Sequence, residues 1–105
     1  MNELIQQMKV VLATTFSLYL KTHYFHWNVE GISFPQYHKF LDDLYNEIFS
    51  AVDSTAEQIR ALNSYAPGSL GRFSELSKIE DEINIPEATK MIKILQIDKI
   101  GRAHV

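Results

Sequence analysis

Five side chains able to bind a metal ion recur at helical spacing in the first half of the chain. They are His26, His38, Asp42, Asp53 and Glu57. His38 and Asp42 are four residues apart, as are Asp53 and Glu57, so each pair shares one face of a helix. At about 100° per residue, His38, Asp42 and Asp53 fall within roughly 60° of one another. Mixed imidazole and carboxylate ligands suit iron or a similar divalent ion, with zinc as a competitor.

One helix cannot bring all of these groups to a single ion. Asp42 and Asp53 are separated by about 16 Å of helix rise, whereas metal bonds to nitrogen and oxygen are about 2 Å long. Two copies packed antiparallel across a two-fold axis would place His38 of one copy opposite Asp53 and Glu57 of the other. The spacing therefore suggests two sites shared between subunits, provided that these residues bind metal.

Each of these residues also has a purely structural interpretation. His26 lies on the apolar stripe of its predicted helix, where a buried histidine bonded to a neighbour is as good an interpretation as a ligand. Asp53 and Glu57 could be solvated, or could pair with Arg60. His23 lies about 60° off the stripe and is left outside the ligand set. The chain contains no Glu-x-x-His motif, which counts against a di-iron centre within one subunit.

The elements that would position these residues are helices. Residues 2–30 carry apolar side chains at alternating spacings of three and four, and Gly31 follows as a stop signal. This pattern predicts a long amphipathic helix. Its stripe consists of Ile5, Met8, Leu12, Thr15, Tyr19, Thr22 and His26.

Further helical patterns follow along the chain. Residues 35–62 predict a second long helix that begins with a proline in its first turn, and residues 63–69 are a cluster of helix breakers. A short helix is expected within residues 73–82. A third pattern begins at residue 86 and stops near residue 95. Two long helices cannot cover both of their apolar faces, so the architecture requires more helices, from missing sequence or from partners.

Composition narrows the class of protein. A chain of 105 residues with 46% hydrophobic residues is one small globular domain. The absence of cysteine excludes disulfides, zinc–thiolate sites and iron–sulfur clusters. A net charge of −3 argues weakly against a nucleic-acid surface. There is no apolar run of about 18 residues to span a membrane, and the N-terminus lacks the basic start of a signal peptide. A cytoplasmic protein is expected.

Four stretches of the sequence resemble the Dps family, the miniferritins. These stretches are residues 20–31, 34–45, 53–62 and 67–76. The resemblance covers about residues 4 to 95, with five separated ligand positions in register. It implies an all-α, ferritin-like four-helix bundle, of which the first two long helices, the short connecting helix and the start of the third are present.

The resemblance also implies a division of the ligands between two subunits. His26 and His38 would come from one subunit, with Asp42 as a supporting ligand beside His38. Asp53 and Glu57 would come from the two-fold mate.

The activity implied by the resemblance is oxidation of ferrous iron with hydrogen peroxide, and storage of the ferric product inside a hollow twelve-subunit shell. Trp27 would lie next to the site and intercept stray radicals. Some family members bind DNA through a Lys-rich N-terminal tail, but residues 1–7 contain no lysine, so DNA binding is not expected. Two alternatives are a non-catalytic helical assembly module, whose buried acids and histidines only fix partner register, and a DNA-compacting protein without ferroxidase activity.

The end of the chain departs from the family. Residues that would complete the third helix and form the fourth are absent, and residues 99–105 match one reading frame of a common sequencing adapter. We therefore expect residues 1–98 to be a truncated ferritin-like domain and residues 99–105 to be a non-native tail, whose His104 is not a ligand candidate. The 105-residue chain by itself is expected to be inactive.

Overall fold

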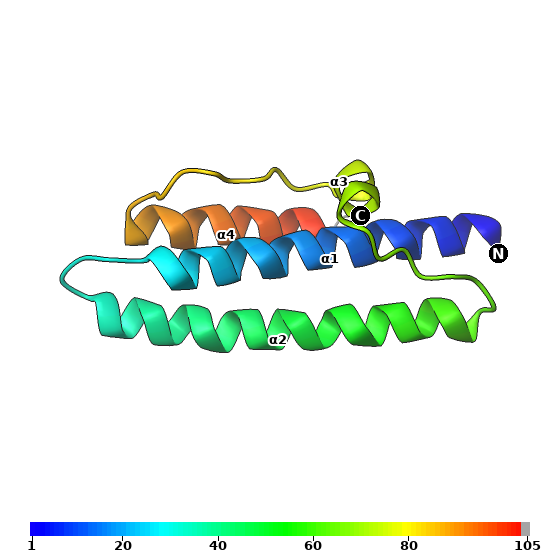
Figure 1. The fold of residues 1–105 in the computed structure, drawn as a ribbon, viewed down its shortest axis with the longest axis horizontal. Coiled ribbons are helices and arrows are strands. Elements are labelled where there is room, and N and C mark those ends of the chain that lie inside the picture. The colour runs from blue at the N-terminus through cyan, green and yellow to red at the C-terminus, as the bar shows by residue number, and fades with distance from the viewer. Residues whose placement is uncertain (104–105) are drawn as a thin grey trace.

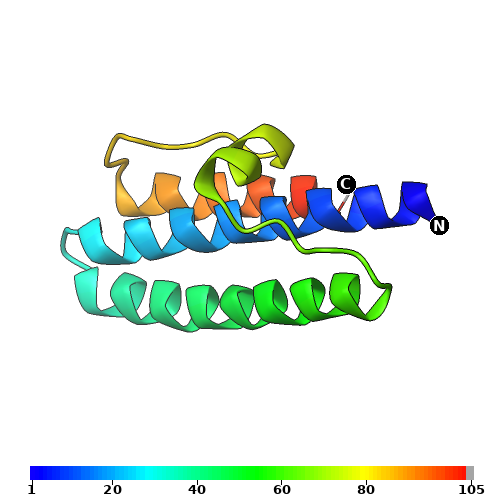
Figure 2. The same ribbon diagram turned by 45° about the vertical axis from the view of Figure 1, so that its right-hand side comes forward.

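A computed structural model of the chain describes residues 1–103, and every regular element within them is a helix. The helices are α1 (Asn2–Asn28), α2 (Phe34–Ala61), α3 (Leu70–Leu76) and α4 (Ala88–Ala103). α1 lies in the middle with α2 and α4 on either side, and both neighbours run antiparallel to it (Figure 1, Figure 2). None of these helices is both long and apolar enough to cross a membrane. The expected all-α class is confirmed.

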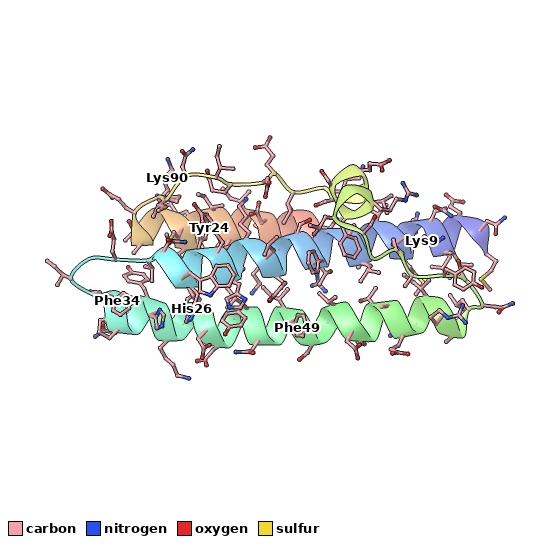
Figure 3. The ribbon with its side chains drawn as sticks, viewed as in Figure 1. Lys9, Tyr24, His26, Phe34, Phe49 and Lys90 are labelled. Carbon is pink, nitrogen blue, oxygen red and sulfur yellow. The ribbon has the colours of Figure 1, made fainter. Side chains whose placement is uncertain are left out.

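The turn between α1 and α2 decides which ends of the two helices meet. Val29 is extended after the last turn of α1, and Gly31 has a φ of +113°, a conformation that strains residues with a side chain. Pro35 stands in the first turn of α2, where its missing N–H is not needed. The turn thus places the end of α1, with His26, beside the start of α2, with Phe34 (Figure 3), and brings His38 next to His26.

Apolar side chains of α1 and α2 fill the space between these helices. On α1 they include Leu12 of the predicted stripe and also Leu18 and Phe25, which lie outside it. Burying a large apolar side chain contributes about 1.5–3 kcal/mol, so this packing holds the two helices together along most of their length. The side chains with almost no exposed surface here are Leu12, Leu18, Phe25, Leu41 and Ile59.

Polar contacts reinforce the packing of α4 on α1. The Lys21 ammonium, on a side chain that is only 7% exposed, lies 2.7 Å from the Asp98 carboxylate. Nearer the end of α4, Arg102 Nε donates to Thr15 Oγ1 at 2.7 Å. The expected non-native tail, residues 99–105, is thus helical in its first part, and its last two residues lie outside the described part of the chain. Its origin stays a prediction.

Two predicted helix boundaries were wrong. The short helix was expected within residues 73–82, but α3 begins earlier because Ser69 Oγ accepts the N–H of Arg72 at 3.2 Å and caps its first turn. The third pattern was expected to stop near residue 95, but α4 continues to Ala103. The two polar contacts of Asp98 and Arg102 with α1 support this extension. An apolar pattern in the sequence does not reveal such contacts.

The connection between α3 and α4 runs back along α1 (Figure 1). Two α1 side chains hold its backbone. Lys21 Nζ donates to the Glu80 carbonyl oxygen at 2.8 Å, and the Tyr24 hydroxyl donates to the Asn84 carbonyl oxygen at 2.8 Å. Tyr24 therefore fixes the connection to α1, while its neighbour Phe25 is fully buried in the core.

Candidate metal centre

His26 and His38 face each other where α1 ends and α2 begins. Their rings stack with centroids 3.8 Å apart and an interplanar angle of 21°. His26 Nδ1 lies 2.9 Å from the carbonyl oxygen of His38, and His38 Nδ1 lies 3.0 Å from the carbonyl oxygen of His26. Phe34 stacks on the His38 ring at 4.9 Å. Each ring is thus held by a stacking partner and by a backbone bond across the helix pair.

The two hydrogen bonds determine which nitrogen of each imidazole is free. A carbonyl oxygen only accepts, so each Nδ1 carries the proton and donates it. In a neutral imidazole the lone pair then lies on Nε2, the nitrogen left to bind a metal ion. Metal-binding histidines usually have this arrangement, because a bond from the second nitrogen orients the ring. The backbone bonds therefore leave Nε2 of each ring as the nitrogen that could bind a metal ion.

Asp42 lies one helical turn after His38 on α2 and is partly buried. Asn46 Nδ2 lies 3.4 Å from its Oδ1. Hydrogen bonding toward Asp42, followed by burial and the Asp42 charge, raises the pKa of Tyr45 above its usual value. The Tyr45 phenol and the Asp42 carboxylate are therefore neighbours on α2.

His23, left outside the predicted ligand set, lies at the centre of an aromatic cluster. Its ring stacks on Tyr45 with centroids 3.8 Å apart and an interplanar angle of 10°, and the Trp27 ring lies 4.2 Å away. The Tyr19 hydroxyl is 2.9 Å from His23 Nδ1. Trp27, expected beside the site, is 59% exposed and packs on this histidine.

The environment of His23 favours its neutral form. Burial and the charge of the neighbouring His26 lower the pKa of His23, while the Asp42 carboxylate partly opposes this shift. His23 was not among the predicted site residues because it lies off the apolar stripe. A signal was nevertheless present, since Tyr19, His23 and Trp27 follow one another at four-residue steps and share one helix face.

Asp53 and Glu57 lie far from the histidines within the same chain. Both are exposed on α2, and Asp53 is about 22 Å of helix rise beyond His38. Arg60, considered as their alternative partner, instead donates to the Ser64 carbonyl oxygen at 3.1 Å. Within residues 1–103, no three His, Asp or Glu side chains are arranged to hold one ion. A single chain thus brings together the two histidines, with Asp42 on the next turn, and leaves the other two carboxylates apart.

The structure is an antiparallel helical protein with two histidines paired between its first two helices. The chain matches the Ferritin family, described as a ferritin-like domain, over residues 5–97, and it belongs to this family. The fold is that of solved Dps proteins. Dps from Staphylococcus aureus superposes with a TM-score of 0.88 at 30% identity, over 93% of this chain and 66% of that one. The resemblance to the Dps proteins and the ferritin-like fold are thereby confirmed.

Two relatives show how much of such a protein the chain represents. Antigen TpF1 of Treponema pallidum is 35% identical over 92 residues, which cover 84% of this chain and 52% of the antigen. DNA protection during starvation protein 1 of Deinococcus radiodurans is 30% identical over 96 residues, which cover 89% of this chain and 46% of that protein. The chain thus spans about half the length of these relatives.

Proposed function

We propose that this chain belongs to a subunit that binds ferrous iron as its substrate and oxidises it with hydrogen peroxide at a site shared between two subunits. Membership of the ferritin-like family supports iron as the metal. The observation that carries the proposal is the reciprocal hydrogen bonding of His26 and His38, which orients two Nε2 lone pairs. Nitrogen and oxygen ligands of this kind suit iron, with zinc as a competing ion.

Asp53 and Glu57 would supply the other half of the site from a second subunit. A two-fold axis near residues 46–48 of α2 lies midway between His38 and these carboxylates. Such an axis repeats every contact, so each pair of subunits would form two sites. Phe49, near the middle of α2 (Figure 3) and 52% exposed, would be covered by this contact. An exposed aromatic ring beside polar ligands favours such an interface.

The proposed reaction consumes two ferrous ions, one hydrogen peroxide and two protons, and it yields two ferric ions and two water molecules. Peroxide is reduced by two electrons, so no hydroxyl radical is released. His26 and His38 would hold iron through Nε2, while Asp42, one helical turn after His38, would support the site. Ferric product would be stored within a shell of twelve subunits, as the resemblance to the family implies.

We also propose that the complete subunit extends beyond residue 98 and that residues 99–105 are not native to it. The coverage of the relatives supports the first part, because the chain spans only 52% of the Treponema antigen. Exposed apolar side chains on α1 and α4, among them Leu4, Leu20 and Ile97, are suited to cover by a further helix. A cytoplasmic location and the lack of DNA binding stay predictions.

Anaerobic titration of the assembled complete subunit with ferrous iron, followed by addition of peroxide, tests this function. We expect saturable binding and two ions oxidised per peroxide. His26→Ala should weaken binding by more than about tenfold, because even groups that only orient a ligand typically contribute that much. Asp43→Ala is the control, since the Asp43 side chain is 63% exposed and pairs with Lys39.

The alternative, a non-catalytic assembly module, makes the opposite forecast for the same variants. In that case His26→Ala would disturb assembly, as judged by size-exclusion chromatography, while the wild-type protein would bind no ferrous iron at all. This outcome would overturn the proposed function.

A further inference from the structure

Phe34, in the first turn of α2, lies outside the packed interior of the molecule, at the same end of the helix pair as His26 (Figure 3). Its side chain is 40% exposed, and it belongs to neither of the two clusters of apolar side chains that hold the described helices together. An aromatic ring left partly in water gives up part of the free energy that burial would contribute. Packing of the helices therefore does not account for a phenylalanine at this position.

The ring partner of Phe34 within residues 1–103 is His38. The two residues are four apart on α2, so their side chains are neighbours on one helix face. Their rings stack with centroids 4.9 Å apart and an interplanar angle of 27°, within the range of favourable aromatic pairs. The rings of Phe34 and His26 are both nearly parallel to His38 but do not stack on each other, so they lie against its two faces.

The hydrogen bond of His38 does not by itself fix its imidazole. The bond from Nδ1 to the His26 carbonyl oxygen holds a single ring atom, and the terminal torsion of a histidine side chain has broad energy wells. The ring could therefore tilt about this bond and change the direction of Nε2. A ring against each face of the imidazole restricts the tilt, because the plane of His38 must then stay between two planes.

We propose, on the basis of the proposed function, that Phe34 is a positioning residue for iron binding. Its ring holds the plane of His38, so that Nε2 meets a ferrous ion in one direction. Phe34 touches no ion and takes part in no step of the oxidation. Since a ligand oriented in advance lowers the cost of capturing the ion, loss of the Phe34 ring weakens metal binding and leaves the maximal rate at saturating iron unchanged.

The first test uses metal-free protein and is therefore independent of the proposed function. Crystal structures of the assembled complete subunit are compared for wild type, Phe34→Leu and Phe34→Tyr. We expect one orientation of the His38 ring in wild type and in Phe34→Tyr, which keeps an aromatic ring. Phe34→Leu should show more than one orientation. A single, unchanged orientation of His38 in Phe34→Leu would overturn the proposal.

The second test is anaerobic titration of the same proteins with cobalt(II), whose visible absorption reports its ligands. We expect Phe34→Leu to raise the dissociation constant by about tenfold, the lower end of what groups that orient a ligand contribute. Phe34→Tyr should restore wild-type binding. Phe40→Leu is the matched control, since Phe40 is 49% exposed on the same helix and stacks on neither histidine in the part of the chain that the structure describes.

Iron oxidation then separates positioning from chemistry. Phe34→Leu should raise the ferrous concentration at half-maximal rate by a similar factor and keep the maximal rate. Equal cobalt affinity in Phe34→Leu and wild type, or equal weakening in Phe34→Leu and Phe40→Leu, would overturn the role of Phe34. If wild type binds no cobalt, the proposed function fails, and the crystal structures still decide whether Phe34 holds His38.

Discussion

The two ends of α2 carry proposed ligands of one site, but the fold of a single chain holds these side chains in place at one end only. Near its start, His38 is fixed by stacking on His26 and by a bond to the backbone of α1. Towards its end, Asp53 and Glu57 are exposed to solvent. The fold of one chain therefore orients the histidine ligands, whereas the carboxylate ligands need a surface from outside the chain.

This difference indicates how such a site depends on assembly. Orienting a ligand before binding lowers the free-energy cost of capturing the ion, and the histidine end meets this condition in a single chain. In the proposed site, the carboxylate end would gain its role only when a two-fold mate brought it to the histidines. Each chain would therefore contribute two histidines that are already held in place and two carboxylates that bind metal only after two chains have paired.

The largest effect should come from leaving both ends without a partner. We expect the 105-residue chain alone to form no defined oligomer and to show no peroxide-dependent iron oxidation, although all five candidate ligands are present. Each large apolar side chain left in water forgoes about 1.5–3 kcal/mol, and domain stability is only about 5–15 kcal/mol. Size-exclusion chromatography with an iron-oxidation assay measures this. A monodisperse, active oligomer would show that these residues suffice.

In the complete assembled subunit, single alanine substitutions of the histidines and of the carboxylates should have similarly large effects. Replacing His26, His38, Asp53 or Glu57 by alanine should lower the initial rate of peroxide-dependent oxidation by more than about 100-fold, since outer groups alone typically account for 10–100-fold. Stopped-flow absorbance of ferric product gives the rates. Unchanged rates in all four variants would refute the ligand assignment, and a loss confined to the histidines would refute the shared site.

Asp42→Ala should have a smaller effect, because Asp42 supports the site. We expect about a tenfold loss of rate, and little change for the neighbouring Asp43→Ala, whose side chain is 63% exposed. The same stopped-flow assay compares the two variants. Equal effects of the two substitutions would remove Asp42 from the site.

The smallest effect concerns the stability of the iron-free protein at mildly acidic pH. The pKa of His23 is lowered on folding from its ordinary value of 6.5, so the unfolded state binds its proton first as pH falls. Stability is fully present above the ordinary value and is lost as pH drops from it towards the lowered value. His23→Phe should flatten this decline, as measured by urea denaturation at about pH 7.5 and pH 5.5. An unchanged slope would contradict the assigned environment of His23.

Much of the fold was predictable because the two long helices carry regular apolar stripes with clear end signals. The predicted bounds of α1 and α2 lie within two residues of those observed. The extent of α4 was not predictable from its own sequence. Its last turns are held by Asp98 and Arg102, which bond to Lys21 and Thr15 far away in the chain. Such long-range pairs produce no periodic pattern in the sequence of either segment.

The candidate site was predictable at the level of residue types and spacing. Helical geometry identified the carboxylates and His38 as sharing one face, and the resemblance to the Dps family added the division between subunits. The reciprocal bonds of His26 and His38 were not predictable, because they depend on how two backbones pass each other. His23 was missed because it lies off the apolar stripe, and its stacking on Tyr45 of the other helix became visible only in the structure.

The most direct test of the shared site is complementation between two inactive subunits. One subunit carries His26→Ala and His38→Ala, the other Asp53→Ala and Glu57→Ala, and the two are denatured together and reassembled. In a mixed pair, one of the two sites takes its histidines and its carboxylates from unaltered halves. Random pairing should then restore about a quarter of the wild-type iron-oxidation activity, while each variant reassembled alone stays inactive. A reassembled mixture as inactive as its components, with normal oligomeric size, would contradict a site shared between subunits.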